Sequence, residues 1–129
     1  MTRRALSAVA ILVVFAIAGM LWFRGGCTPE TCGPLVGSEM RNLVARQETY
    51  RAQHGAFATT LDELGATPAP PVRLELVHTD SEGWIARGTH DQLEGLGCVA
   101  WMGTIPTLPA TPRGARAEEE GRVYCDFPT

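Results

Sequence analysis

Lysine is absent from this sequence, in which all 11 basic residues are arginines. The 14 acidic residues outnumber them, so the formal net charge at pH 7 is −3. No segment concentrates arginines densely enough to follow a phosphate backbone, and nucleic acid is not an expected partner. With 129 residues, the chain is long enough for one small domain and an anchor, but too short for two independent cores.

The sequence also lacks the motifs of common catalytic and metal sites. Ser81, His90 and Asp91 could meet in space, but no nucleophile elbow or oxyanion-forming motif surrounds any serine. The three histidines are scattered and are interpreted as solvated or locally bonded. The acidic run at residues 118–120 lacks the alternating ligand spacing of a calcium loop and is interpreted as a solvated loop. We therefore expect no catalytic residue, no cofactor and no metal site.

An uncharged apolar run extends from Ala5 to Phe23. As a helix it would span roughly 28 Å, about the hydrocarbon thickness of a bilayer. Two arginines precede it and a single Arg24 follows, so the positive-inside rule places the N-terminus in the cytoplasm. We predict a transmembrane anchor over residues 1–24 in the inner (cytoplasmic) membrane, with the C-terminal domain periplasmic or extracellular. A cleaved signal peptide is the alternative, because residues 16–18 (Ala-Ile-Ala) match a small-x-small cleavage site.

The segment after the anchor changes from turn-forming to helical residues. Residues 25–37 are rich in Gly, Pro and Cys and predict a linker. From Ser38, residues of one face recur at spacings of three and four, which predicts an amphipathic helix capped by Ser38 and ended by Gly55. This face consists of Met40, Leu43, Val44, Gln47, Tyr50 and His54. Thr60 then begins a capping box for one short helical turn, closed by Gly65.

After a proline-rich spacer at residues 66–71, the hydrophobic period becomes that of a strand. Trp84 and Trp101 lie within expected strands and are interpreted as core or sheet-face residues. Residues 104–121 form a long connection that is either mobile or specialised for contacts. The predicted fold is α+β, with the helix packed on a four-stranded antiparallel meander in a head domain over residues 38–129. The four strands are expected at residues 72–76, 84–90, 98–103 and 122–127.

Four cysteines follow the anchor, where an oxidising space would favour disulfides. Cys98 opens the expected third strand and Cys125 falls in the fourth, so antiparallel pairing would bring them together. Cys27 and Cys32 then remain for a small local ring, although four cysteines allow three connectivities. The spacing of this second pair is longer than in a redox Cys-x-x-Cys motif, and no histidine is near it in the sequence. The pair is therefore interpreted as structural.

The segment NLVARQETYRAQHGAFATTLDELG, residues 42–65, resembles the end of the long N-terminal helix and the following turn in type IV pilins and type II secretion pseudopilins. The matching positions are Leu43, Gln47, Tyr50, Gly55, Phe57, Leu61, Leu64 and Gly65. The resemblance covers residues 38–127, since the later strands look like the family's meander. It implies a non-enzymatic, membrane-anchored structural subunit whose partners are other pilin-like or secretion-system subunits. It also implies that the helix packs on the sheet through Leu43, Tyr50, Phe57, Leu61 and Leu64.

The N-terminus departs from that family's pattern. The family's export signal has a Gly at the cytoplasmic edge and a Glu at the fifth position of the apolar run. Here residues 3–6 read Arg-Arg-Ala-Leu, and no acid lies within the run. Two other functions stay open. The 104–121 connection and the tryptophans would suit a ligand-binding or adhesive module, and free thiols at Cys27 and Cys32 would suit a small extracytoplasmic thiol enzyme.

Overall fold

A computed structural model describes residues 25–129. The predicted anchor at residues 1–24 and the alternative cleavage site lie outside the described residues. Within residues 25–129, no helix combines the length and the apolar character needed to cross a membrane.

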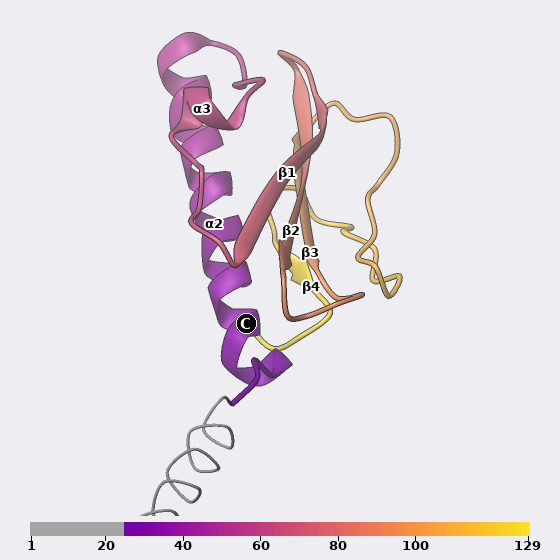
Figure 1. Ribbon diagram of the computed structural model, residues 1–129. Helices are drawn as coiled ribbons and strands as arrows, with labels where there is room; N and C mark the ends of the chain where they lie inside the picture. The colour runs from indigo at the N-terminus through magenta and orange to yellow at the C-terminus, as the bar shows by residue number, and fades with distance from the viewer. Residues whose placement is uncertain (1–24) are drawn as a thin grey trace, which may run out of the picture.

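The described chain forms one long helix, one short helix and four strands. The sheet has the order β1-β2-β3-β4, with every neighbouring pair antiparallel. α2 lies along one face of this sheet, and the connection between β3 and β4 runs on the other side (Figure 1). The predicted α+β class and the four-stranded antiparallel meander are confirmed. The elements are α2 (Pro29–His54), α3 (Leu61–Leu64), β1 (Val72–Thr79), β2 (Gly83–His90), β3 (Cys98–Gly103) and β4 (Tyr124–Cys125).

The helix begins earlier than predicted, so the expected linker over residues 25–37 is wrong from Pro29 onward. Thr28, and not Ser38, is the N-cap, and it forms a capping box with Thr31. Pro29 is tolerated because the first helical N–H has no intrahelical partner. Pro34 lies inside the helix and leaves the Glu30 carbonyl without its helical donor, but Glu30 is exposed to water.

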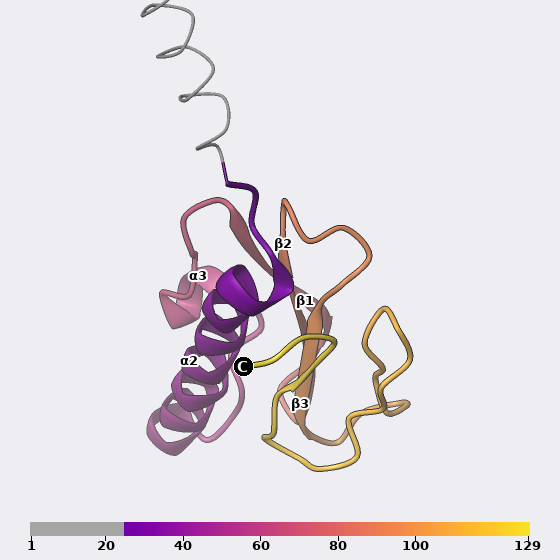
Figure 2. The same cartoon turned by 90° about the horizontal axis from the view of Figure 1, so that it is seen from below.

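Tertiary contact with the C-terminal segment holds this early part of the helix. A Cβ atom on Gly33 would lie 2.5 Å from Phe127 Cδ2, so only glycine permits the observed approach. Gly37 faces Thr129 in the same way. Seen along α2, the C-terminus lies beside the helix (Figure 2). The packing partner is distant in the sequence, which explains why local signals favoured a linker.

The core lies between α2 and the inner face of the sheet. Val36, Met40 and Leu43 are fully buried on the helix side. Trp84 and Ala86 of β2, together with Cys98 and Ala100 of β3, are fully buried on the sheet side. Gly88 brings the two layers together, because a Cβ atom there would lie 2.8 Å from Met40 Cγ and 3.0 Å from Val36 Cγ1.

A buried amide ties the end of α2 to the chain that follows. Gly55 ends the helix in the left-handed conformation, as predicted, and the chain reverses. The Gln47 side chain then makes two hydrogen bonds to the backbone of Ala58. Its Nε2 donates to the carbonyl at 3.0 Å, and its Oε1 accepts from the N–H at 3.0 Å. Gln47 is fully buried, so these bonds satisfy polar groups that water does not reach.

The connection over residues 104–121 folds against the outer side of the sheet. Trp101 donates its indole N–H to the carbonyl of Ala117, at 2.7 Å, and Ala117 is fully buried. Within the connection, Ala110 and Arg116 form an isolated antiparallel bridge. The connection therefore packs on β3 and covers its outer face.

Two strands differ in length from the prediction. β1 continues to Thr79 through a bulge between Leu76 and His78, where the pairing register with β2 shifts. Val77, between them, is exposed, so an apolar residue stands at an outward position and the hydrophobic pattern stops at Leu76. β4 contains only Tyr124–Cys125. The strand ends before Asp126. The Asp126 N–H donates to the Gly97 carbonyl, and the Asp126 carboxylate accepts from the Gly97 N–H and from the Thr111 hydroxyl.

Both predicted cysteine pairs are disulfides. Cys98 and Cys125 are directly opposite in the β3–β4 ladder, with Cα atoms 4.1 Å apart. Cys27 and Cys32 join the segment before α2 to its first turn, with Cα atoms 5.6 Å apart.

Replacing Gln47 by Met should destabilise the fold. The substitution nearly conserves volume but removes both hydrogen bonds to Ala58, and unpaired buried polar groups cost about 1–3 kcal/mol each. We expect a loss of about 3 kcal/mol in the free energy of unfolding, measured by urea denaturation of the full-length protein in detergent. Gln53→Met, at an exposed position on the same helix, is the control and should change little. Equal effects of the two substitutions would contradict the role given to Gln47.

Removing the two disulfides should have unequal effects. The Cys98–Cys125 bond joins residues 27 apart in the sequence, whereas Cys27–Cys32 joins residues 5 apart. Loop-closure entropy gives about 3–4 kcal/mol for the first and about 2 kcal/mol for the second. The double alanine variants, compared by the same urea titration, should follow this order. If the variant without Cys27 and Cys32 lost more unfolding free energy than the variant without Cys98 and Cys125, loop-closure entropy would not be the main contribution of these disulfides.

Candidate functional site

A disulfide, Cys27–Cys32, joins the segment before α2 to the first turn of the helix. Thr28 is the N-cap, so Cys27 occupies the position before it and Cys32 the fourth helical position. In many helices these two positions carry a pair of apolar side chains that pack together and fix the entry of the chain. Here a disulfide takes their place, beside the Thr28–Thr31 capping box.

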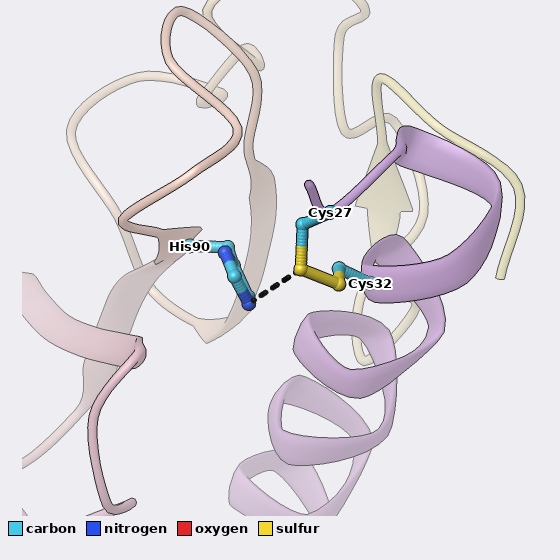
Figure 3. A group of neighbouring side chains, drawn as sticks. All are labelled: Cys27, Cys32 and His90. Carbon is cyan, nitrogen blue, oxygen red and sulfur yellow. Dashed lines mark hydrogen bonds between the residues drawn. A yellow bond between two sulfur atoms is a disulfide. The ribbon is translucent and has the colours of Figure 1, made fainter. Parts of the chain in front are cut away.

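His90, the last residue of β2, completes a cluster with this disulfide (Figure 3). It is only 3% exposed, and its Nε2 lies 3.5 Å from Cys27 Sγ. Gln92 holds both partners in place. Its backbone N–H donates to His90 Nδ1 at 3.1 Å, and its side-chain Oε1 accepts from the Cys27 N–H at 3.0 Å.

The hydrogen bond from Gln92 determines the tautomer of His90. A backbone N–H can only donate, so His90 Nδ1 must be the acceptor and carry no proton. The neutral imidazole therefore has its proton on Nε2, which points to Cys27 Sγ. His90 is a hydrogen-bond donor to the sulfur.

The same arrangement bears on metal binding. The ligand atoms of Cys27, Cys32 and His90 lie within 4.8 Å of one another, a spacing that a metal site could use. Metal-binding histidines donate from the nitrogen that is not coordinated, whereas Nδ1 here accepts. Both sulfur atoms are also joined in the disulfide. The donor set fits a hydrogen-bonded disulfide better than a metal centre.

Of the two interpretations given for His90, solvated or locally bonded, the first is wrong, because the side chain is buried, and the second is confirmed by the bond from the Gln92 N–H. The sequence did not reveal its contact with the cysteine pair. Cys27 and His90 are 63 residues apart, so their contact exists only in the folded chain. The alternation of β2 was the available signal, because Trp84, Ala86, Gly88 and His90 share its buried face. Ser81 precedes β2, whereas His90 ends it, so the considered triad is not assembled.

The other two histidines are bonded locally, as expected. His54 is exposed and stacks on Tyr50, with ring centroids 4.0 Å apart. His78 pairs with Asp80, with Nε2 and Oδ2 separated by 3.2 Å.

The residues expected to pack the helix on the sheet divide into two groups. Leu43, Phe57 and Leu64 are buried in the core, while Leu61 and Tyr50 are partly buried at its edge. Tyr50 joins α2 to α3, because its hydroxyl donates to Glu63 Oε2 at 2.7 Å. This bond lowers the pKa of Glu63, helped by a bond from Thr60, and raises the pKa of Tyr50.

A groove of about 510 Å³ lies between the outer side of α2 and the segment before β4. Each wall of the groove carries one basic and one acidic side chain: Arg41 and Glu48 on the helix, and Arg122 and Glu120 on the opposite segment. The acidic run beside it is exposed, as predicted, and Glu119 pairs with Arg122 at 3.2 Å. The groove is lined by Arg41, Val44, Ala45, Glu48, Glu120, Gly121, Arg122 and Val123.

No protein-family model matches the chain, and no curated protein matches it significantly. We therefore base the functional proposals on the fold, the outer side of α2 and the Cys27–Cys32–His90 cluster.

The Tyr50–Glu63 bond can be tested by titration. Glu63 has a folded-state pKa below its ordinary value, so its contribution to stability is present above that ordinary value and is lost as the pH falls through the folded-state pKa. Tyr50→Phe removes the largest cause, and the pKa of Glu63 should rise towards normal in a carboxyl ¹³C NMR titration. Tyr124→Phe is the control, since the Tyr124 hydroxyl accepts from the backbone N–H of Glu119 and is not bonded to Glu63. An unchanged Glu63 titration in Tyr50→Phe would refute the assignment.

Proposed function

We propose that this chain is a membrane-anchored, pilin-like or pseudopilin-like structural subunit that acts through protein–protein contacts in a pilus or secretion-type assembly. The observation that supports it best is the arrangement of α2. One side of this helix packs on a four-stranded antiparallel meander, and the other side is exposed along most of its length. The resemblance of residues 42–65 to pilin sequences supports the same function.

The outer side of α2 has the character of a contact surface for another subunit. Arg41 and Glu48 lie on the helix wall of the groove, and Glu120 and Arg122 lie on the opposite wall. A surface with both signs of charge can form complementary pairs with a copy of itself or with a similar subunit. We therefore assign the groove to contact with a second copy of this chain or a closely similar subunit.

The start of α2 connects this surface to the proposed anchor. In the sequence, only residues 25–28 separate the predicted anchor from the helix. The capping box and the Cys27–Cys32 bond restrict the direction in which the chain enters α2. An anchor at residues 5–23 would hold α2 close to the inner membrane and concentrate subunits in two dimensions.

The adhesive alternative has less support. It needs the tryptophans and the 104–121 connection to form an exposed recognition surface. Trp84 is fully buried, and Trp101 uses its indole N–H to hold Ala117 against the sheet. Part of the connection therefore packs on the sheet and is not free to form a recognition surface.

Site-specific photocrosslinking in the native membrane tests the proposed contact. A photoreactive residue at Ala45, in the groove, should give adducts with a second copy or a similar subunit, identified by mass spectrometry. The same residue at Arg87, exposed on β2, is the control and should give few. Arg41→Glu should reduce the Ala45 adduct several-fold. Absence of an Ala45 adduct, or equal adducts at the two positions, would reject the proposal.

A further inference from the structure

The two sulfur atoms of the Cys27–Cys32 disulfide have different surroundings. Cys27 Sγ receives the Nε2–H of buried His90. Cys32 Sγ is 3.8 Å from the Thr31 hydroxyl, whose single proton has a closer acceptor in the Thr28 carbonyl at 3.2 Å. A negative charge would therefore be better stabilised on Cys27 than on Cys32.

The helix dipole favours a thiolate at this disulfide. Cys27 lies just before the N-cap of a helix of 26 residues and Cys32 lies in its first turn, so both are at the positive end of the dipole. A helix terminus is a weak influence by itself, but here a buried N–H donor is aimed at Cys27 Sγ, and this donor makes the two sulfur atoms unequal. Gln92 holds that donor in the correct tautomer and also binds the Cys27 backbone.

From this geometry we propose that Cys27–Cys32 is an exchange-competent disulfide, reduced by the dithiol of a partner protein, with Cys27 as the leaving thiolate and His90 as the residue that stabilises it. The lower the pH at which a thiol ionises, the faster it leaves in thiol–disulfide exchange. Such an exchange site does not require the pilin-like function, and each can fail without the other.

The exchange proceeds in two balanced steps. A thiolate of the partner attacks Cys32 Sγ and forms a mixed disulfide, while the electron pair of the broken S–S bond leaves on Cys27. The second thiol of the partner, as thiolate, then attacks the partner's sulfur in the mixed disulfide and releases Cys32, which takes a proton. The partner's dithiol is oxidised to a disulfide, and Cys27–Cys32 gains two electrons. The second of the partner's two protons passes to solvent, and Cys27 stays a thiolate bonded to His90 Nε2–H.

The second disulfide is the internal reference. In the Cys98–Cys125 disulfide, Cys98 is fully buried and Cys125 is partly buried, as Cys27 and Cys32 are. Within the described residues neither of its sulfur atoms receives a side-chain hydrogen-bond donor, so neither thiolate would have the stabilisation that His90 gives to Cys27. The start of α2 does not depend on its disulfide alone. The Thr28–Thr31 capping box and the packing of Phe127 on Gly33 remain when Cys27 and Cys32 are reduced. We therefore expect selective reduction of one disulfide in a folded protein.

The charged groups near the cluster are exposed and offset one another in part. Glu30 lies in the first turn of α2, and Glu94 lies after β2. Arg73 of β1 pairs with Asp91 at 2.7 Å, and their side chains are 72% and 40% exposed. None of these charged side chains is hydrogen-bonded to Cys27 Sγ, whereas the buried Nε2–H of His90 is 3.5 Å from it, so His90 should dominate the ionisation of Cys27.

The first experiment follows the reduction of full-length protein in detergent by reduced glutathione, with samples taken at successive times. After trapping with a maleimide, intact mass should reveal a species with two labels, and peptide mass mapping should place both labels at Cys27 and Cys32. His90→Phe removes the donor and should slow reduction of this disulfide by about tenfold or more, because the leaving thiolate loses its stabilisation. His54→Phe, at the far end of α2, should not change the rate. Simultaneous reduction of both disulfides, or an unchanged rate in His90→Phe, would overturn the proposal.

A second measurement does not depend on exchange. In Cys32→Ser, the iodoacetamide reaction of Cys27 should show a pH midpoint below about 8.5, the value of a free thiol. In Cys27→Ser, the midpoint of Cys32 should be higher than that of Cys27. Adding His90→Phe to Cys32→Ser should raise the Cys27 midpoint. A Cys27 midpoint at or above 8.5 would overturn the proposal. So would stoichiometric zinc binding by the reduced protein that is lost in His90→Phe, because His90 would then be a ligand.

Discussion

The close approach of α2 to β2 is the constraint on which the rest of the structure depends. It requires a position without a side chain on the strand, and Gly88 provides it opposite Val36 and Met40. Two residues farther along the same face of β2 is His90. Since the helix and strand are already in register at Gly88, His90 must meet the start of α2, where the Cys27–Cys32 disulfide lies. The geometry of the candidate redox cluster is thus a consequence of core packing.

Besides the apolar core, a few hydrogen bonds and one disulfide hold the connecting segments and the last strand in place. Gln47 satisfies both backbone groups of Ala58 in a region closed to water, so the chain that leaves α2 has one well-defined path to α3. Cys98–Cys125 joins β4, which has only two residues, covalently to β3. On the outer side of the sheet, Trp101 holds the long connection by donating to the Ala117 carbonyl and accepting from the Gly121 N–H. Asp126 holds it by accepting from the Thr111 hydroxyl and the Arg113 N–H.

The two proposed activities involve different parts of α2. The groove for subunit contact lies along the outer side of the helix, around Ala45, while the disulfide and His90 lie at its first turn. A change in the redox state of Cys27 and Cys32 would act at the junction between the predicted anchor and the head, and would leave the groove residues in place. Subunit contact and thiol exchange can therefore coexist in one protein without competing for the same side chains.

The sequence by itself determined the helix C-termini and the fold class, because both depend on conformational preferences of residues close together in the chain. Glycines that accept the left-handed conformation end both helices, at Gly55 and Gly65, and alternation identifies the strands and hence the α+β fold. Adjacent antiparallel strands favoured the Cys98–Cys125 pair, but the structure was needed to select it among the three possible connectivities. Only the tertiary structure decided that α2 begins at Pro29, that residues 104–121 cover the sheet, that Tyr50 bonds α3, and that His90 meets Cys27. Most of these outcomes rest on contacts between residues far apart in the chain, with Phe127 on Gly33 and His90 on Cys27 as examples, and local propensity carries no information about such partners.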